Sequence, residues 1–394
     1  MPNIAYGESK EGKEDSKENH KPTVAARAAI LMDAKTGRVL WEKNANEPMS
    51  MASTTKIMTA ILALESERKE EIVTVSRKAA AAPKMKMNLT TGEKIRLYDL
   101  MQALMLESSN DAAVAIAEHL AGSVSEFCQM MTEKAKEIGA KDTVYETPNG
   151  LDAGDHHSTA YDLAVITRYA LEVPGFIELT NTAEAKFSSD RKTYSMINKN
   201  RLLREYQGAN GVKTGFTNLA GHCFVGAAKR DDMQLISVVL ASGWGEKGKA
   251  MKWVDTKEVL NYGFGNFEYE TIITDGDIAG MVPVTRSRTT VLKYAFDEGL
   301  TIPLSNEEKE EVRIQIPESL QAPVALNEAI GEAQIFVDGQ LYATILLTAT
   351  GEALRHDFKT SLEKVLNEWF GQVTGHTVNV VLPEPPQSSK EAAN

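Results

Sequence analysis

The sequence has two cysteines in 394 residues, no run of about 20 apolar residues and no block of basic residues. Cys128 and Cys223 cannot build a disulfide framework, and neither has zinc-finger spacing around it. The lack of a long apolar run excludes a polytopic membrane protein. A net charge of −12, from 43 basic and 55 acidic residues, argues against nucleic-acid binding. An apolar fraction of 42 % is ordinary for a globular protein with a sizeable core.

The character of the sequence changes along its length. The first 22 residues are charged and unpatterned, and they contain no apolar stretch of a signal peptide. Helical periodicity is lost after about residue 268, where alternating apolar residues and the turn signal Asp338-Gly339 predict strands. The predicted divisions are a disordered tail at 1–22, a catalytic domain at 23–267, a small β-domain at 268–352, an amphipathic helix at 353–371 and a flexible tail at 372–394.

Local patterns within 23–267 predict helices and two pairs of strands. One pair is a hairpin of Ala28–Met32 with Arg38–Lys43, and the other joins Gly221–Ala228 to Leu235–Ala241 in antiparallel fashion. The predicted helices are Met51 to Glu67, Tyr98–Leu106, Asp111–Leu120, Phe127–Ile138, Ala160–Leu171 and Lys249–Tyr262.

Ser53 and Lys56 stand three residues apart in Ser53-Thr-Thr-Lys56, at the start of a predicted helix. This spacing places both side chains on one helix face, within reach of each other. A serine hydroxyl becomes a strong nucleophile when a base takes its proton. A lysine serves as that base only when it is neutral, which burial or a second nearby cation favours. The structural interpretation of the same residues is an N-capping serine followed by a surface lysine.

Two further short motifs have both a structural and a functional interpretation. Ser108-Ser109-Asn110 breaks two helices and is typical of a capped loop, but Ser108 also fits a proton relay and Asn110 a hydrogen bond to a substrate amide. Lys213-Thr214-Gly215 is typical of an edge strand. In the functional interpretation Lys213 supplies the second cation, Thr214 binds a carboxylate, and Gly215 lets a ligand backbone approach closely.

In this order, S-x-x-K, S-x-N and K-T-G form the signature of penicillin-recognising serine enzymes. The gaps are 55 residues from Ser53 to Ser108 and 105 residues from Ser108 to Lys213. The sequence resembles a low-molecular-mass penicillin-binding protein of the serine-type D-alanyl-D-alanine carboxypeptidase family. The matching stretches are Ala52–Thr59, Ser108–Ala112, Thr147–Leu151, His157–Leu163 and Gly211–Thr217. One departure is Ser109, where relatives frequently have glycine.

The resemblance implies the fold class α/β (α+β), a transpeptidase- and β-lactamase-like domain with an antiparallel sheet flanked by helices, plus a small C-terminal all-β domain. The sheet is expected to combine strands from early and late segments. Ser53 is expected to start a largely buried helix, and the K-T-G motif is expected on the strand that borders the cleft. The resemblance implies no metal and no cofactor.

The resemblance also implies acyl transfer on a peptidoglycan stem peptide that ends in D-Ala-D-Ala. Ser53 would attack the carbonyl between the two D-alanines, and Lys56 would take its proton. The backbone N–H groups of Ser53 and Phe216 would hold the oxyanion. Ser108 would pass a proton to the leaving D-alanine. The resemblance further implies that Asn110 contacts the substrate. At the terminal carboxylate it implies Lys213, Thr214 and Lys199, and Arg201 is the alternative to Lys199. β-Lactams would acylate Ser53.

Several alternatives stay open at this stage. A class A β-lactamase needs an E-x-x-L-N loop between the second and third motifs, and none occurs there; Glu258-Val-Leu-Asn261 is one residue too short and follows K-T-G. A peptidoglycan DD-endopeptidase and a non-catalytic penicillin-binding sensor remain alternative functions. Asp155, His156 and His157 have no fourth residue at metal-ligand spacing and are expected in a loop.

Peptidoglycan lies outside the cytoplasmic membrane, so the resemblance implies an exported enzyme whose signal peptide has been removed. The amphipathic helix at 353–371 has two interpretations. It contacts the membrane surface, as in relatives, or it packs on the β-domain. Its polar face mixes Lys359 and Lys364 with Glu363 and Glu368, so it is not strongly basic.

Overall fold

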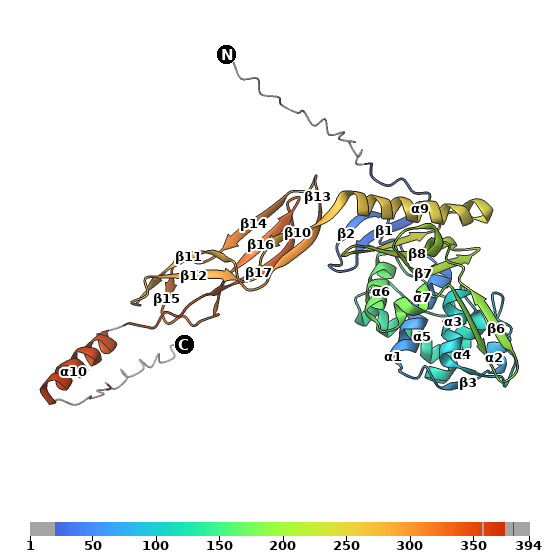
Figure 1. Ribbon diagram of the computed structural model, residues 1–394, viewed down its shortest axis with the longest axis horizontal. Helices are drawn as coiled ribbons and strands as arrows, with labels where there is room; N and C mark the ends of the chain where they lie inside the picture. The colour runs from blue at the N-terminus through green and yellow to red at the C-terminus, as the bar shows by residue number, and fades with distance from the viewer. Residues whose placement is uncertain (1–19, 357, 375–380, 382–394) are drawn as a thin grey trace, which may run out of the picture. The chain divides into compact units, whose positions relative to one another are not determined.

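The computed structural model of the chain describes residues 20–356, 358–374 and 381. The predicted tails at 1–22 and 372–394 fall largely outside this range. The chain forms two compact units, Met1–Glu268 and Tyr269–Asn394 (Figure 1). Each unit has its own buried apolar core.

A five-stranded antiparallel sheet runs through the first unit in the order β2-β1-β9-β8-β7. Its strands are β1 (Ala28–Asp33), β2 (Val39–Lys43), β7 (Ala209–Thr217), β8 (Gly221–Arg230) and β9 (Met233–Leu240). Strand β1 pairs with β2 on one side and with β9 on the other, so early and late segments share one sheet. The predicted hairpin, the predicted strand pair and the α/β fold class are therefore confirmed.

Helices cover both faces of this sheet, with α9 on one face and α6 on the other (Figure 1). Strands β8 and β9 are consequently buried along almost their whole length, which explains their near-continuous apolar sequence. The helices of the unit are α1 (Lys56–Glu65), α2 (Arg77–Ala80), α3 (Leu97–Leu106), α4 (Asn110–Ala121), α5 (Val124–Glu137), α6 (Ala160–Glu172), α7 (Phe176–Asn181), α8 (Leu202–Glu205) and α9 (Gly245–Asn266).

Helix α1 is buried from Lys56 to Ala63 and packs against helices α3, α4, α5 and α6. A helix that is buried all round requires an apolar sequence on every face, which α1 has apart from Lys56 and Thr59. The predicted helix from Met51 is interrupted, because Ala52 has a φ of +50° and residues Ala52–Thr55 form a 3₁₀ turn. The expectation of a side-chain cap is wrong, since no cap hydrogen bond forms at Thr55.

Two small two-stranded sheets were not predicted from the sequence. They are β3 (Ile72–Thr74) with β4 (Lys94–Arg96), and β5 (Glu184–Ser188) with β6 (Thr193–Ile197). Their strands are three to five residues long and mostly exposed, so their apolar pattern is weak.

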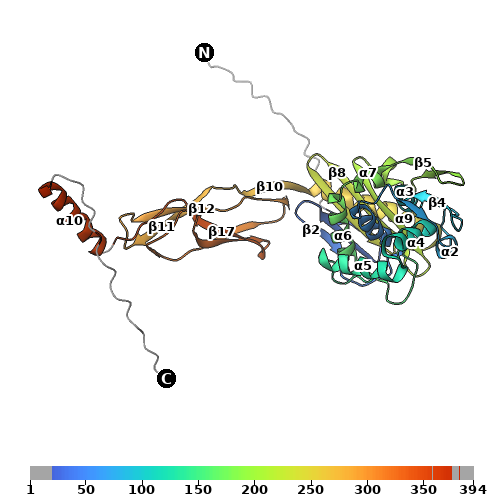
Figure 2. The same ribbon diagram turned by 90° about the horizontal axis from the view of Figure 1, so that it is seen from below.

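The second unit contains a β-domain, whose strands run along its length (Figure 2). Six strands form one sheet in the order β14-β16-β17-β12-β11-β15, and β10 pairs with β13. The bounds are β10 (Phe267–Ile273), β11 (Ile278–Thr285), β12 (Val291–Phe296), β13 (Leu300–Ser305), β14 (Glu310–Gln315), β15 (Leu320–Gln321), β16 (Ala329–Val337) and β17 (Gln340–Ala349). The turn predicted at Asp338-Gly339 joins β16 to β17 and is confirmed.

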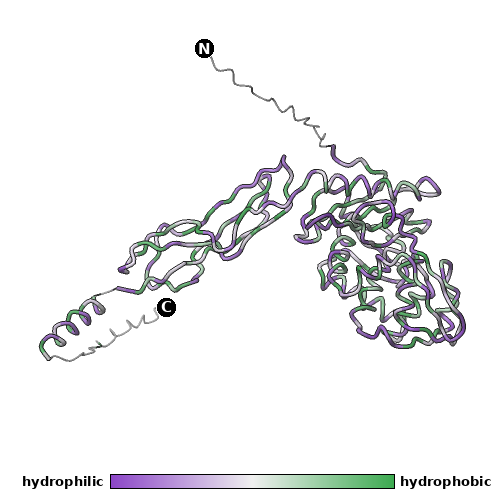
Figure 3. Tube along the Cα trace, in the orientation of Figure 1, coloured by the Kyte–Doolittle hydropathy of each residue, from purple (hydrophilic) through white to green (hydrophobic). Residues whose placement is uncertain are grey.

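Helix α10 (Phe358–Thr374) follows the β-domain in sequence. It begins five residues later than the helix predicted at 353–371. Hydrophobic and hydrophilic residues alternate along it (Figure 3), and Phe358, Val365 and Trp369 are exposed. Among the helices that the structure describes, none is long and apolar enough to cross a membrane.

Candidate active site

The turn that carries Ser53 is stabilised by the hydroxyl groups of the two threonines that follow Ser53. The Thr54 hydroxyl donates a hydrogen bond to the Met51 carbonyl at 2.7 Å, and the Thr55 hydroxyl donates to the Ala52 carbonyl at 2.8 Å. Ala52 has a left-handed φ of +50°, which is uncommon for a residue with a Cβ atom. The two threonine hydroxyls therefore stabilise a backbone conformation that the sequence alone would not favour.

Two glycines let other segments pack directly on this turn. A Cβ atom on Gly150 would lie 1.8 Å from the Ala52 carbonyl oxygen, and Gly150 also has a φ of +81°. A Cβ atom on Gly215 would lie 3.1 Å from the Ser53 backbone nitrogen. The Ser53 turn therefore approaches Gly215 closely, and the expectation that Gly215 also lets a ligand backbone approach stays a prediction.

Lys56 lies directly behind Ser53 and is fully buried. Its Nζ is 2.9 Å from the Ser53 Oγ, 2.9 Å from the Asn110 Oδ1 and 2.5 Å from the Asn149 carbonyl oxygen. The i, i+3 contact expected from the S-x-x-K spacing is thus present. The surface-lysine interpretation is wrong, because Lys56 has no exposed area.

The surroundings of Lys56 favour its neutral form. Burial lowers its pKa well below the usual value, Lys213 lowers it further, and Asp111 acts in the opposite direction. A neutral amine has two N–H donors and one lone pair. The two carbonyl oxygens, of Asn110 and Asn149, can accept the two N–H bonds, which leaves the lone pair facing the Ser53 hydroxyl. This is the arrangement that a general base requires.

Asn110 is anchored at both ends of its amide. Its Oδ1 accepts from Lys56, and its Nδ2 donates to the carbonyls of Pro83 and Lys84 at 3.3 Å and 3.0 Å. Both polar atoms are therefore engaged within the protein. Ser108, two residues earlier, has a φ of +66° and faces the same cavity as Ser53.

The K-T-G motif lies on β7, the edge strand of the sheet, as expected. Lys213 is only 2 % exposed, so it does not serve as a solvated edge-strand lysine. Its Nζ donates to the Thr214 carbonyl at 3.2 Å. Burial lowers the pKa of Lys213 to about 7, with further lowering by Lys252 and Lys199.

A cavity of about 420 Å³ opens beside Ser53. Its lining residues are Ser53, Met85, Ser108, Lys199, Arg201, Thr214, Gly215, Phe216, His222, Lys249, Lys252 and Trp253. Five of the predicted site residues line it, and the other three, Lys56, Asn110 and Lys213, are buried. The three motifs therefore lie around one cavity.

Lys199 and Arg201 both reach this cavity, but each is partly exposed and paired with a carboxylate. The Nζ of Lys199 lies 3.8 Å from a carboxylate oxygen of Glu107. The guanidinium of Arg201 lies 2.7 Å from Glu205.

Sequence reasoning missed several residues of this region. The Asn149 carbonyl gives no side-chain signal at all. Lys249 and Lys252 stand at i, i+3 spacing in a helix that was predicted, so their common face was the available signal. Trp253 is 5 % exposed and its ring packs near the Lys252 ammonium, 5.0 Å from Nζ to the ring centroid.

Both ring nitrogens of His156 form hydrogen bonds within the protein, and one of them contacts the Ser53 turn. Its Nδ1 accepts from the Glu146 N–H at 3.0 Å, and its Nε2 lies 2.8 Å from the Thr55 hydroxyl, which it can reach as a donor. Burial lowers the pKa of His156 to about 4, helped by His157 and Lys56, so the ring is neutral at physiological pH. Among the described residues, no three His, Cys, Asp or Glu side chains form a group that could hold a metal ion.

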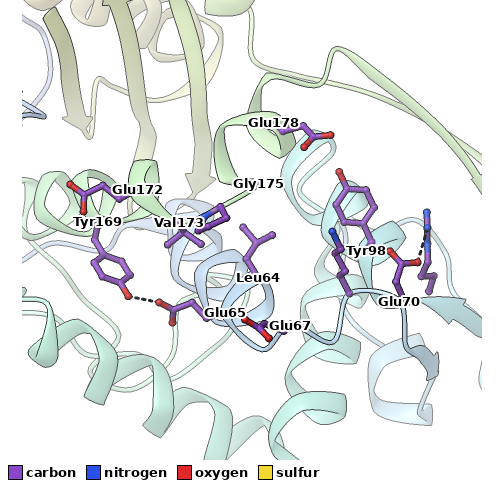
Figure 4. Close-up of a pocket in the computed structure, with 13 residues that line it drawn as sticks. Leu64, Glu65, Glu67, Glu70, Tyr98, Tyr169, Glu172, Val173, Gly175 and Glu178 are labelled. Atoms are coloured by element: carbon purple, nitrogen blue, oxygen red, sulfur yellow. Dashed lines mark hydrogen bonds and ion pairs between the residues drawn. The ribbon is translucent and has the colours of Figure 1, made fainter. Parts of the chain in front are cut away.

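A second and larger hollow of about 1000 Å³ lies in the same unit, at the end of α1 and beside α6 and α7 (Figure 4). Its walls include five glutamates against Lys69 and Arg96, and the Tyr169 hydroxyl bonds Glu65. None of the motif residues lines it, so we place the chemistry in the smaller cavity.

Comparison with known proteins gives two family matches. The sequence pattern of the family described as D-alanyl-D-alanine carboxypeptidase matches residues 15–243. The pattern described as penicillin-binding protein 5, C-terminal domain, matches residues 267–353.

Individual relatives agree over most of the chain. It is 29 % identical to D-alanyl-D-alanine carboxypeptidase DacF of Bacillus subtilis (strain 168), over 93 % of this chain and 95 % of that protein. It is 30 % identical to D-alanyl-D-alanine carboxypeptidase DacA of Escherichia coli (strain K12), over 89 % and 90 %. The crystal structure of penicillin binding protein 5 from Haemophilus influenzae is similar, with a TM-score of 0.72 and 27 % identity over 85 % of this chain and 99 % of that chain.

Proposed function

The chain belongs to the D-alanyl-D-alanine carboxypeptidase family and is a cell-wall carboxypeptidase of the penicillin-binding protein type; we propose that it works through an acyl-enzyme on Ser53. The observation that carries this proposal is the position of Lys56, whose Nζ lies 2.9 Å from the Ser53 Oγ while two carbonyl oxygens occupy its other directions. The relatives' names favour carboxypeptidase activity over an endopeptidase or a non-catalytic sensor.

In the first step, neutral Lys56 takes the Ser53 hydroxyl proton and the Ser53 Oγ attacks the carbonyl between the two terminal D-alanines. The N–H groups of Ser53 and Phe216 stabilise the oxyanion. Support for this pairing comes from the packing of Gly215, the residue before Phe216, against the Ser53 backbone nitrogen. The C–N bond then breaks, and the leaving D-alanine nitrogen receives its proton through Ser108.

In the second step, water attacks the ester carbon and the bond to the Ser53 Oγ breaks. Lys56 accepts the proton of the water and returns a proton to Ser53, so the enzyme regains its starting state. Asn110 acts in both steps as a positioning residue. It holds Lys56 while its own amide is fixed by the carbonyls of Pro83 and Lys84.

The terminal carboxylate of the substrate is bound at the K-T-G end of the cavity. Thr214 and Lys199 line the cavity there, and Lys213 adds positive charge from a buried position. A β-lactam carries an activated carbonyl and a carboxylate, placed relative to each other much as the scissile carbonyl and the terminal carboxylate are in the peptide. It therefore enters the same site and forms a slowly hydrolysed ester with Ser53.

The substrate places the enzyme outside the cytoplasmic membrane, so we propose that the protein is exported. Contact of α10 with the membrane surface is proposed from its exposed Phe358, Val365 and Trp369, with packing on the β-domain as the alternative. Co-sedimentation with anionic lipid vesicles, with and without α10, distinguishes the two.

The function is tested by incubating the full chain with an acylated peptide ending in D-Ala-D-Ala and measuring free D-alanine. We expect release by the wild type and by Ser195→Ala, an exposed serine on β6. Ser53→Ala is expected to release none. D-Alanine release that persists in folded Ser53→Ala contradicts the proposal. Penicillin labelling of Ser53 without D-alanine release favours the sensor, and cleavage of cross-linked dimers alone favours the endopeptidase.

A further inference from the structure

A cavity of about 340 Å³ lies in the second unit, lined by the loop that joins β11 to β12 and by the segment that leads from β17 into α10. Two backbone contacts hold this loop and this segment together. The His356 N–H donates to the Arg286 carbonyl at 2.6 Å, and Ser287 pairs with Arg355 in an isolated antiparallel bridge. The His356 Nε2 also lies 3.3 Å from the Ser361 hydroxyl of α10. The walls of the cavity are therefore fixed to one another.

The lining of this cavity is positive, although the whole chain has a net charge of −12. Arg288, Arg355 and Lys364 line it against one carboxylate, that of Glu352. Arg288 forms no ion pair with any residue that the structure describes. Each arginine presents a planar fork of N–H donors that matches the oxygens of a phosphate group. The cavity therefore suits an anion with several oxygens, such as a phosphate ester.

Exposed apolar side chains adjoin the cavity. Leu354 lines it and is 68 % exposed. Phe358, Val365 and Trp369 recur at helical spacing along one face of α10, and all three are exposed. Lys364, which lines the cavity, directly precedes Val365. A ligand with an anionic head and an apolar body would contact both features, whereas a soluble phosphate ester would contact only the cations.

We propose that this cavity binds the phosphate of an anionic membrane phospholipid, while the apolar face of α10 enters the acyl region beside it. The assignment rests on the membrane contact of α10 proposed above and adds a headgroup site formed largely outside that helix. Arg288 and Arg355 are the main cations of the site, and Lys364 supports them. Glu352 repels the anion and limits its affinity.

The helix alone does not explain a preference for anionic lipid. Lys359 and Lys364 of α10 are offset by Glu363 and Glu368 on the same helix. The Nζ of Lys364 lies 3.7 Å from a carboxylate oxygen of Glu368. The two arginines of the cavity precede α10 in the sequence. Selectivity for the phosphate is therefore assigned to residues of the β-domain and of the segment that follows it.

The test measures co-sedimentation of the full chain with two kinds of vesicle, phosphatidylcholine alone and phosphatidylcholine mixed with phosphatidylglycerol. In Arg288→Gln we expect the affinity for the anionic vesicles to fall about 5-fold, the usual contribution of one basic residue at an anionic surface. Binding to the neutral vesicles is expected to match wild type, because it depends on the apolar face of α10. Lys309→Gln removes the same charge from an exposed residue of the same unit outside the cavity, and it is expected to match wild type on both vesicles.

Glu352→Gln tests the site in the opposite direction. It removes the one carboxylate among the described lining residues, so the affinity for anionic vesicles is expected to rise. Equal weakening by Arg288→Gln and Lys309→Gln would show that only general surface charge matters and would overturn the site. Weaker binding of Arg288→Gln to neutral vesicles would overturn it as well. These are substitutions of exposed residues, so thermal unfolding is expected to stay close to that of wild type.

A soluble competitor distinguishes the lipid from a free phosphate ester. Glycerol phosphate carries the same anionic group without acyl chains, and we expect it to displace the chain from anionic vesicles only in large excess over the lipid. Displacement at equal concentration would assign the cavity to soluble phosphate esters and overturn the lipid assignment.

The outcomes also separate this assignment from the proposals on which it rests. Wild-type binding to neutral and anionic vesicles with equal affinity would overturn the headgroup site alone. Binding to neither vesicle would overturn the membrane contact of α10 and the headgroup site together. The Ser53 mechanism is independent of both results, because D-alanine release is measured on a soluble peptide.

Discussion

The side-chain nitrogen of Lys56 lies 2.9 Å from the hydroxyl oxygen of Ser53, three residues before it. The contact spans the junction between a 3₁₀ turn and α1. Lys56 is therefore fixed by the helix and the surrounding core, while Ser53 is presented on a turn at the cavity wall. The predictions below test the separate parts of this arrangement.

Replacing Lys56 with methionine keeps the length of the side chain and removes the base. We expect the rate constant for acylation of Ser53 by a penicillin to fall about 10²- to 10⁴-fold, the usual contribution of a general base. Folding is expected to be preserved, because an apolar side chain fits a fully buried position. Mass spectrometry of quenched samples gives the rate, and a wild-type rate in Lys56→Met would contradict the role of Lys56.

Asn110→Asp is expected to move the pH dependence of acylation. Acylation needs neutral Lys56, so its rate falls when the pH drops through the pKa of Lys56. A carboxylate at position 110 stabilises the ammonium form and raises that pKa, so the acid limb shifts to higher pH. Asn110→Ala removes the same hydrogen bond without adding charge and is the control. If the acid limb of the pH–rate profile of Asn110→Asp lies at the same pH as in the wild type, or at a lower pH, the proposed role of Lys56 is contradicted.

Gly150→Ala is expected to disrupt the Ser53 turn. The new Cβ atom would lie 1.8 Å from the Ala52 carbonyl oxygen, which is backbone and cannot move aside cheaply. Gly139→Ala is a matched control, because Gly139 also has a left-handed φ, of +95°, but has nothing within 4 Å of the added atom. We expect Gly150→Ala to lose penicillin labelling and Gly139→Ala to keep it, with only a modest loss of stability. Equal behaviour of the two variants would show that the packing on Ala52 is unimportant.

Lys213→Met is expected to stabilise the free enzyme at low pH while impairing catalysis. The pKa of Lys213 is about 7 in the folded protein against 10.5 ordinarily, so between these values the unfolded chain binds more protons. The contribution of Lys213 to the free energy of unfolding of the wild type should therefore increase as the pH rises from 7 toward 10.

At pH 6 the wild type has to hold a charged Lys213 in a buried place. Lys213→Met should therefore be more stable there by roughly 1–4 kcal/mol. The advantage should shrink by pH 9.5. Urea unfolding of both proteins at the two pH values gives the difference. A variant that is less stable than wild type at pH 6 would contradict this sign.

The sequence was sufficient to predict those parts of the fold and the site that depend on the regular spacing of side chains. The S-x-x-K spacing predicted the contact of Lys56 with Ser53, and the sheet strands followed from long apolar runs such as Leu235–Ala241. The 3₁₀ turn was not predictable, because it depends on Gly150 and Gly215, which are distant in sequence and act through the space they leave open. The Asn149 carbonyl was missed for a similar reason, since a backbone group has no residue-specific pattern.

The burial of Lys252 could also not be read from the sequence. Its helix was predicted and Lys249 was visible three residues before it, but a charge on a helix usually lies in solvent. Only the packing of α9 against β8 and β9 shows that this side chain is buried and faces the cavity.

The central claim is tested most directly by incubating the protein with a penicillin and locating the covalent adduct by peptide mass spectrometry. We predict one adduct, on Ser53, which forms in the wild type and in Ser195→Ala and is absent from Ser53→Ala. An adduct on a different residue, or none on folded wild-type protein, would contradict the acyl-enzyme mechanism.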